Sequence, residues 1–139
     1  CRSGYNLGMT DLPARIMLID DDDNLRGVIT ETLQARGNVS VMSCASCKRA
    51  IGVSRQFSPN LILLDLRMPG KDGTETLKAL REIKALDNVP VIFVTGAHKV
   101  NMIDDYKKLG VIGVIHKPFT PSELKEYISG IWGEYHMAG

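Results

Sequence analysis

The strongest constraint on the fold is a set of short apolar runs, four of which end at a polar or charged residue. The run at 16–19 leads into four consecutive aspartates, and the run at 61–64 leads into Asp65. Continuous apolar runs of this length, separated by helical patterns, are typical of strands buried in a parallel sheet. Five strands are expected, at residues 15–20, 39–43, 61–65, 90–95 and 112–116.

The segments between these runs carry the spacing of amphipathic helices, with apolar residues three and four positions apart. The last helix has the clearest start, because Thr120-Pro121-Ser122-Glu123 combines a capping box with proline at the first helical position. The expected stripes are Leu25, Val28, Ile29 and Leu33 in the first helix, Leu77, Leu80 and Ile83 in the third, and Leu124, Tyr127, Ile128 and Ile131 in the fifth; the second helix is expected at 47–56 and the fourth at 99–109.

Five alternations of strand and helix predict an α/β fold with right-handed crossovers and helices on both faces of a doubly wound parallel sheet. Composition alone does not fix the strand order. In the flavodoxin-like order 2-1-3-4-5, the first and third strands are neighbours and their carboxyl ends meet at one edge. Asp20, Asp21 and Asp65 would then converge, with Thr95 and Lys117 beside them.

The acidic run at residues 20–23 requires a compensating charge, because adjacent carboxylates repel one another. Mg²⁺ binds carboxylate oxygens and often bridges them to phosphate. We expect Asp20 and Asp21, which directly follow a strand, to bind the metal. Asp22 and Asp23 are expected to be solvated, with one of them capping the first helix.

Asp65, Thr95 and Lys117 complete a site for a divalent metal and a phosphoryl group. A carboxylate beside a metal can act as a nucleophile and form an acyl phosphate. A hydroxyl and an ammonium group can then contact the phosphoryl oxygens. Each residue alone also has an ordinary interpretation, as a turn cap, a strand-end hydroxyl or a surface lysine. Their joint placement at strand ends favours the phosphoryl site.

Two other kinds of site match parts of the sequence. Asp20, Asp22, Asn24 and Glu31 match positions of a calcium-binding loop, but Leu25 stands where that loop needs glycine, and a strand precedes it. Separately, a lone C-x-x-C at residues 44–47 lies between a strand and a helix start, where a lowered thiol pKa would suit redox chemistry. The alternative for these cysteines is simple packing of two small side chains.

Composition excludes several classes of protein. The net charge of +1 gives no electrostatic basis for binding nucleic acid or an anionic membrane. No apolar stretch is long enough to span a bilayer, and no secretory signal is recognisable. Three cysteines cannot all pair, which argues against a disulfide framework. A cytoplasmic location is therefore expected.

The motifs together make the chain resemble a two-component response-regulator receiver domain of the chemotaxis-regulator type. The resemblance covers residues 15–132 and includes the spacing Asp-x-x-Met-Pro-x-x-Asp-Gly. It implies one receiver domain at 9–139, preceded by a tag or flanking segment at 1–8 that has no role in the fold. No DNA-binding module is expected after the last helix. The matching stretches are 16–21, 65–73, 91–95 and 117–119.

The resemblance implies a role for each site residue. Asp65 resembles the aspartate that accepts a phosphoryl group from a sensor histidine kinase or phosphotransfer protein. Lys117 resembles the lysine that pairs with the phosphoryl oxygens, and Thr95 resembles the switch hydroxyl. Such a domain catalyses its own aspartyl phosphorylation and dephosphorylation, unlike a conventional enzyme. Phosphorylation would switch a partner-binding surface on the fourth helix, fifth strand and fifth helix.

The resemblance also implies the Mg²⁺ ligands: the carboxylates of Asp21 and Asp65, Asp20 partly through water, and the backbone carbonyl of Arg67. A cis peptide bond is implied between Lys117 and Pro118.

Two features depart from common family members. Val114 stands at a position that is often aromatic. Arg67 and Ala97 occupy positions that tune dephosphorylation. The alternative function is a phosphorylation-independent interaction module on the same fold.

Overall fold

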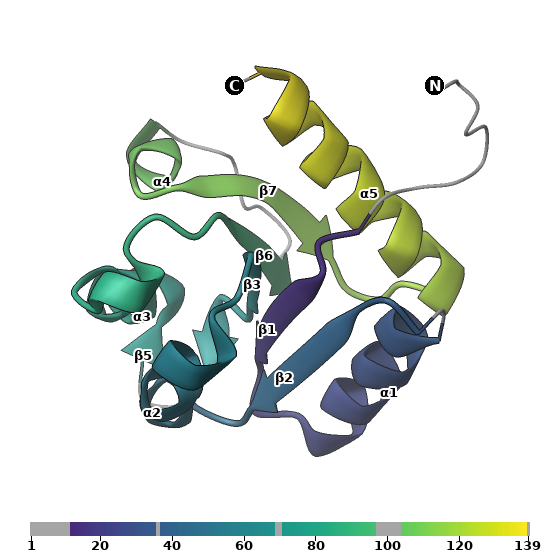
Figure 1. The fold of residues 1–139 in the computed structure, drawn as a ribbon, viewed down its shortest axis with the longest axis horizontal. Helices are drawn as coiled ribbons and strands as arrows, with labels where there is room; N and C mark the ends of the chain where they lie inside the picture. The colour runs from purple at the N-terminus through teal and green to yellow at the C-terminus, as the bar shows by residue number, and fades with distance from the viewer. Residues whose placement is uncertain (1–11, 36, 69–70, 97–103, 139) are drawn as a thin grey trace.

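A five-stranded parallel sheet forms the centre of the molecule in the computed structural model, which describes residues 12–35, 37–68, 71–96 and 104–138 (Figure 1). The strand order is β2-β1-β3-β6-β7. This is the predicted order 2-1-3-4-5 once a short pair, β4 (Arg67–Met68) and β5 (Lys71–Asp72), is set aside. The strands of the sheet are β1 (Arg15–Ile19), β2 (Ser40–Cys44), β3 (Leu61–Leu64), β6 (Val91–Thr95) and β7 (Val111–His116).

Helices cover both faces of the sheet and enclose two apolar cores. In Figure 1, α1 and α5 lie on one side, and α2 and α3 on the other. Alternate strand residues face opposite cores, so Ile16 and Leu18 belong to the first and Met17 and Ile19 to the second. The helices are α1 (Asp23–Gln34), α2 (Cys47–Phe57), α3 (Gly73–Arg81), a 3₁₀ turn η1 (Lys84–Leu86), α4 (Asp104–Lys108) and α5 (Pro121–Ala138).

Two predicted stripe residues are exposed rather than buried, and a third lies outside its helix. Val28 is 46% exposed and Tyr127 is 44% exposed. Each lies one position before a fully buried isoleucine, Ile29 or Ile128, and one position turns a helix by about 100°. Ile83 lies beyond the end of α3, because that helix stops at Arg81.

Two helix starts agree with the predicted caps. The side chain of Asp22 accepts a hydrogen bond of 3.0 Å from the backbone N–H of Leu25. At α5, the backbone N–H of Thr120 donates to Glu123 Oε1 at 2.8 Å, and the Glu123 N–H donates to Thr120 Oγ1 at 3.1 Å. The Lys117–Pro118 peptide bond is cis, as predicted.

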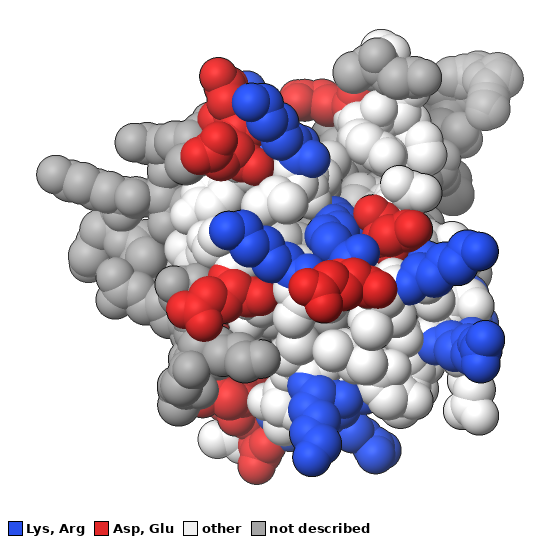
Figure 2. Space-filling view, turned by 90° about the vertical axis from the view of Figure 1, so that its left-hand side faces the viewer, with Lys and Arg blue, Asp and Glu red and all other residues white. Residues whose placement is uncertain are grey.

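The fourth helix was predicted to span residues 99–109, whereas α4 is described only from Asp104 to Lys108. Residues 99–103 of that prediction lie outside the described residues, as do residues 1–11. Within the described part of the chain, no helix is both long and apolar enough to cross a bilayer. The face that carries α2, α3 and α4 shows acidic and basic side chains interspersed, without a broad patch of one sign (Figure 2).

Candidate functional site

The carboxyl ends of four strands bring the predicted residues to one edge of the sheet. Asp20 follows β1, Asp65 follows β3, Thr95 ends β6, and Lys117 follows β7. The register joins these ends directly, because the Asp65 N–H donates to the Ile19 carbonyl at 2.9 Å. The Lys117 N–H in turn donates to the Thr95 carbonyl at 2.8 Å. Residues far apart in sequence are thus held together by main-chain hydrogen bonds.

Asp20 is held in place by contacts at both its backbone and its side chain. Its side chain is buried, and Oδ1 accepts from the Asp22 N–H at 2.9 Å. Its own N–H donates to the Cys44 carbonyl at 3.1 Å. Arg26 Nη1 donates to the Asp20 carbonyl at 2.8 Å, while Nη2 of the same guanidinium pairs with Asp23. The carboxylate therefore has a fixed position and keeps Oδ2 toward the site.

Lys117 brings an ammonium group to two buried carboxylates. Its Nζ lies 3.0 Å from Asp20 Oδ2 and 3.6 Å from Asp65 Oδ2. Asp65 is 6% exposed and Thr95 is fully buried. Counting Asp21, three carboxylates face one ammonium group, which leaves an excess of negative charge. A cation or the positive end of another group would be attracted to this edge.

The acids have the spacing that a divalent metal requires. One carboxylate oxygen from each of Asp20, Asp21 and Asp65 lies within 4.8 Å of the others, and Asp21 is exposed to solvent. Opposite ligands of an octahedral Mg²⁺ are about 4.2 Å apart, given metal–oxygen distances of about 2.1 Å. The oxygens are thus close enough for two or three of them to hold the ion with little movement. This donor set fits Mg²⁺, which prefers oxygen ligands.

The loop after β3 passes close to the site. It contains the unpredicted hairpin of β4 and β5, in which Arg67 pairs with Asp72 through the backbone. A Cβ atom at Gly73 would lie only 2.9 Å from the Leu66 Cα and 3.0 Å from its carbonyl oxygen. Glycine at this position therefore lets α3 begin directly against the residue that follows Asp65. Ala97, predicted to tune dephosphorylation, lies outside the described residues.

Arg26 is a site residue that the sequence analysis missed. Its guanidinium reaches back over the first turn of α1 to the Asp20 carbonyl. The sequence signal was present, since an arginine soon after an acidic run can turn back toward it. However, Asp20 and Arg26 are six residues apart across a strand–helix junction, and this spacing belongs to no periodic pattern. Only the folded structure therefore identifies their contact.

The two alternative sites do not match the observed geometry. Asn24 and Glu31 lie within α1, so the segment cannot wrap a calcium ion as a loop. Cys44 and Cys47 are buried, and neither is in a disulfide. Burial raises the pKa of the Cys44 thiol, and nearby Arg49 and Arg26 offset this only in part. A raised pKa is the opposite of what the redox interpretation needs.

Comparison with known proteins settles the family. A family model described as the response regulator receiver domain matches residues 16–129. The chain belongs to this family. It is 30% identical over 114 residues to sporulation initiation phosphotransferase F of Bacillus subtilis, covering 82% of this chain and 90% of that protein.

Two further relatives agree with this family assignment. The chain is 36% identical to the nitrate/nitrite response regulator protein NarL of Escherichia coli, covering 81% of this chain but only 51% of that protein. Among solved structures, the chemotaxis protein CheY4 of Vibrio cholerae superposes with a TM-score of 0.75 at 25% identity, covering 85% of this chain and 98% of that one. Both the fold and the family predicted from the sequence are therefore confirmed.

Proposed function

We propose that Asp65 accepts a phosphoryl group from a phosphohistidine of a sensor kinase or phosphotransfer protein, in a reaction that depends on Mg²⁺. The observation that carries the proposal is the position of the Asp65 carboxylate. It is buried at a strand end, 3.6 Å from the Lys117 ammonium and grouped with Asp20 and Asp21. Membership of the receiver family supports the same role.

In the proposed step, an Asp65 carboxylate oxygen bonds to phosphorus while the phosphorus–nitrogen bond of the donor breaks. The electron pair of that bond returns to the imidazole, which remains with the donor protein. Mg²⁺ held by Asp20, Asp21 and Asp65, with the Arg67 carbonyl as a further ligand, would neutralise charge on the phosphoryl oxygens. Lys117 would exchange its contact with Asp65 for one with a phosphoryl oxygen, and Thr95 would donate its hydroxyl to another.

The proposed consequence is a shift between two conformations that the protein already samples. Thr95 and Lys117 are joined through a main-chain hydrogen bond of 2.8 Å, so a change at either residue reaches the end of β7. The surface that includes α4, β7 and α5 would respond, within a single receiver domain at residues 9–139. Such a domain would act in the cytoplasm, where its donors expose their phosphohistidines.

The test is labelling with a small acyl phosphate in the presence of Mg²⁺, followed by mapping of the modified peptide by mass spectrometry. The wild-type protein should gain one phosphoryl group on the peptide that contains Asp65. Asp65→Asn, or removal of Mg²⁺ with a chelator, should abolish the gain. Asp105→Asn removes an exposed carboxylate on α4 and should label normally. Equal labelling of Asp65→Asn would overturn the proposal, because another residue would then carry the phosphoryl group. A wild-type protein that gains no phosphoryl group would instead favour the phosphorylation-independent interaction module.

A further inference from the structure

The loop after β1 carries two of the three clustered carboxylates, and its backbone decides where they lie. The Asp20 N–H donates to the Cys44 carbonyl at 3.1 Å, and the Asp22 side chain caps α1. Between these anchored residues lies Asp21, the exposed member of the cluster. Because peptide groups are planar, the two that flank Asp21 set the direction in which its side chain leaves the backbone.

Each of the two peptide groups that flank Asp21 makes a hydrogen bond. On one side, the Asp22 N–H donates to Asp20 Oδ1 at 2.9 Å. On the other, the Asp20 carbonyl accepts from Arg26 Nη1 at 2.8 Å. The Arg26 side chain is only 17% exposed, and a hydrogen bond from a charged donor is stronger than one between neutral groups. Arg26 therefore holds the peptide group that joins the two acids.

Asp23 holds the Arg26 guanidinium in this orientation. Nη2 pairs with an Asp23 carboxylate oxygen while Nη1 contacts Asp20, and the planar guanidinium fixes both directions at once. The Arg26 N–H donates to the Asp22 carbonyl at 2.9 Å, so the same residue also closes the first turn of α1. Asp23 was expected to be solvated, and at 86% exposure it is, but it also makes this contact.

We propose that Arg26 is a positioning residue for the metal site. It holds the Asp20–Asp21 peptide group so that the carboxylates of both residues meet that of Asp65, and Asp23 orients it. Arg26 acts through these acids and not by contact with the phosphoryl group. The inference deepens the proposed function and rests on it for the choice of Mg²⁺ as the cation.

Positioning and simple electrostatics predict changes of opposite sign. Arg26 puts a positive charge beside a site for a cation, so loss of the charge alone would tighten the binding of Mg²⁺. Loss of a group that holds metal ligands in place weakens binding, by about 10–100-fold in metal sites where such contacts have been removed. The direction of the change in Mg²⁺ affinity therefore distinguishes the two roles.

The first test is a titration with Mg²⁺, without any phosphoryl donor, followed by amide chemical shifts of the isotope-labelled protein. Arg26→Met should raise the dissociation constant about tenfold. Arg26→Lys keeps the charge but cannot make both contacts in the same fork geometry, so it should also weaken binding. Arg55→Met removes an exposed arginine from α2 and should bind like the wild type. Tighter or unchanged binding by Arg26→Met, or by Arg26→Lys if the methionine variant fails to fold, would refute the inference.

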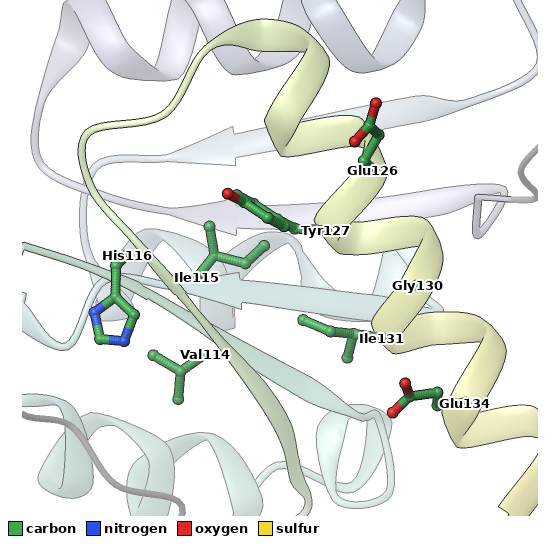
Figure 3. A pocket seen from close by; sticks show the side chains of 8 residues that line it. All are labelled: Val114, Ile115, His116, Glu126, Tyr127, Gly130, Ile131 and Glu134. Atoms are coloured by element: carbon green, nitrogen blue, oxygen red, sulfur yellow. The ribbon is translucent and has the colours of Figure 1, made fainter.

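Asp23→Asn tests whether Asp23 acts through Arg26. Because Asp23 is 86% exposed, its ion pair is worth little by itself, and we expect only about a twofold loss of Mg²⁺ affinity. In the Arg26→Met background the same substitution should have no further effect, whereas a purely electrostatic effect of Asp23 would persist there. Glu134→Gln is the matched control, because Figure 3 shows this exposed carboxylate across a hollow between β7 and α5 from His116, the residue before Lys117. A loss that persists without Arg26 would overturn the role of Asp23.

Labelling with the acyl phosphate separates positioning from a general structural defect. In Arg26→Met, the Mg²⁺ concentration that gives half of the maximal labelling rate should rise about tenfold. The rate at saturating Mg²⁺ should stay close to that of the wild type, because the reacting groups are unchanged. A rate that stays low at saturating Mg²⁺ would overturn a role that acts through the metal ligands.

The Mg²⁺ titration and the labelling can fail separately, which distinguishes this inference from the proposed function. A wild-type protein that binds Mg²⁺ but is not labelled, together with weak binding by Arg26→Met, would overturn phosphorylation and support the positioning role. Labelling of the wild type, together with full Mg²⁺ affinity in Arg26→Met, would remove the positioning role alone. A wild-type protein that binds no Mg²⁺ would refute both.

Discussion

At the scale of single residues, the site depends on one ammonium group between two buried carboxylates. Lys117→Met removes the charge but keeps the length of the side chain. Asp20 and Asp65 would then lose the ammonium group that lies between them, at a cost of about 1–3 kcal/mol in the absence of metal. We expect a smaller loss in the free energy of unfolding than for a fully buried ion pair, because the Lys117 side chain is 24% exposed. Urea denaturation without Mg²⁺ measures it.

The same substitution should increase the stabilisation that Mg²⁺ provides. A cation that binds only the folded site stabilises the protein by mass action, and removal of Lys117 makes the site more negative. Lys107→Met, on the exposed surface of α4, should change neither quantity. A Lys117→Met protein as stable as the wild type without metal would show that the contacts of Lys117 with Asp20 and Asp65 contribute little to folding.

Asp21 should have the opposite effect. It is exposed and belongs to the carboxylate cluster, so Asp21→Ala removes repulsion without leaving a buried group unpaired. We expect a higher urea midpoint without Mg²⁺ and a smaller increase when Mg²⁺ is added. Glu31→Ala is the matched control, because it removes an exposed carboxylate from α1 and also tests the rejected calcium loop. A lowered midpoint for Asp21→Ala without metal would count against repulsion in the cluster.

At the scale of elements, the start of α5 makes a local prediction. The hydroxyl of Thr120 caps the helix through the Glu123 N–H at 3.1 Å. Thr120→Ala should therefore reduce the free energy of unfolding by about 1 kcal/mol. Thr120→Ser retains the oxygen and should lose much less, when both are measured by urea denaturation. Equal losses would indicate that the methyl group of Thr120, rather than its cap, stabilises this end.

Elements with strong local signals were predicted well from the sequence. The five strands and the starts of α1, α2 and α5 agree to within a residue or two, because apolar runs and capping residues encode them locally. The β4–β5 pair was missed, since two-residue strands have no periodicity. The exposure of Val28 was missed because spacing alone does not locate the centre of a buried helix face.

At the scale of the whole molecule, the candidate site could be predicted only in combination with the strand order. Local spacing placed Asp20, Asp65, Thr95 and Lys117 at strand ends, but their convergence needs β1 beside β3 and β6 beside β7. Composition cannot supply that order; the family resemblance did. Contacts such as the guanidinium of Arg26 on the Asp20 carbonyl depend on the assembled fold, and no spacing rule predicts them.

The buried Cys44 gives a prediction for the stability of the whole fold at alkaline pH. Burial raises the pKa of its thiol in the folded protein, so the unfolded chain loses this proton first as the pH rises. The folded state then binds more protons, and the free energy of unfolding falls from about pH 8.5 upward. Below that pH both states keep the proton and the effect vanishes.

Urea denaturation of wild type and Cys44→Ala under reducing conditions tests this. Loss of the side chain gives Cys44→Ala a constant penalty, whereas its free energy of unfolding should fall less steeply between about pH 8.5 and pH 10. The gap between the two proteins should therefore narrow as the pH rises. Lysines and tyrosines also titrate in this range, but they are the same in both proteins. Their contributions therefore cancel in the difference between the two free energies of unfolding. A gap that widens would mean that the thiolate is favoured in the folded state, and would revive the redox interpretation of the C-x-x-C segment.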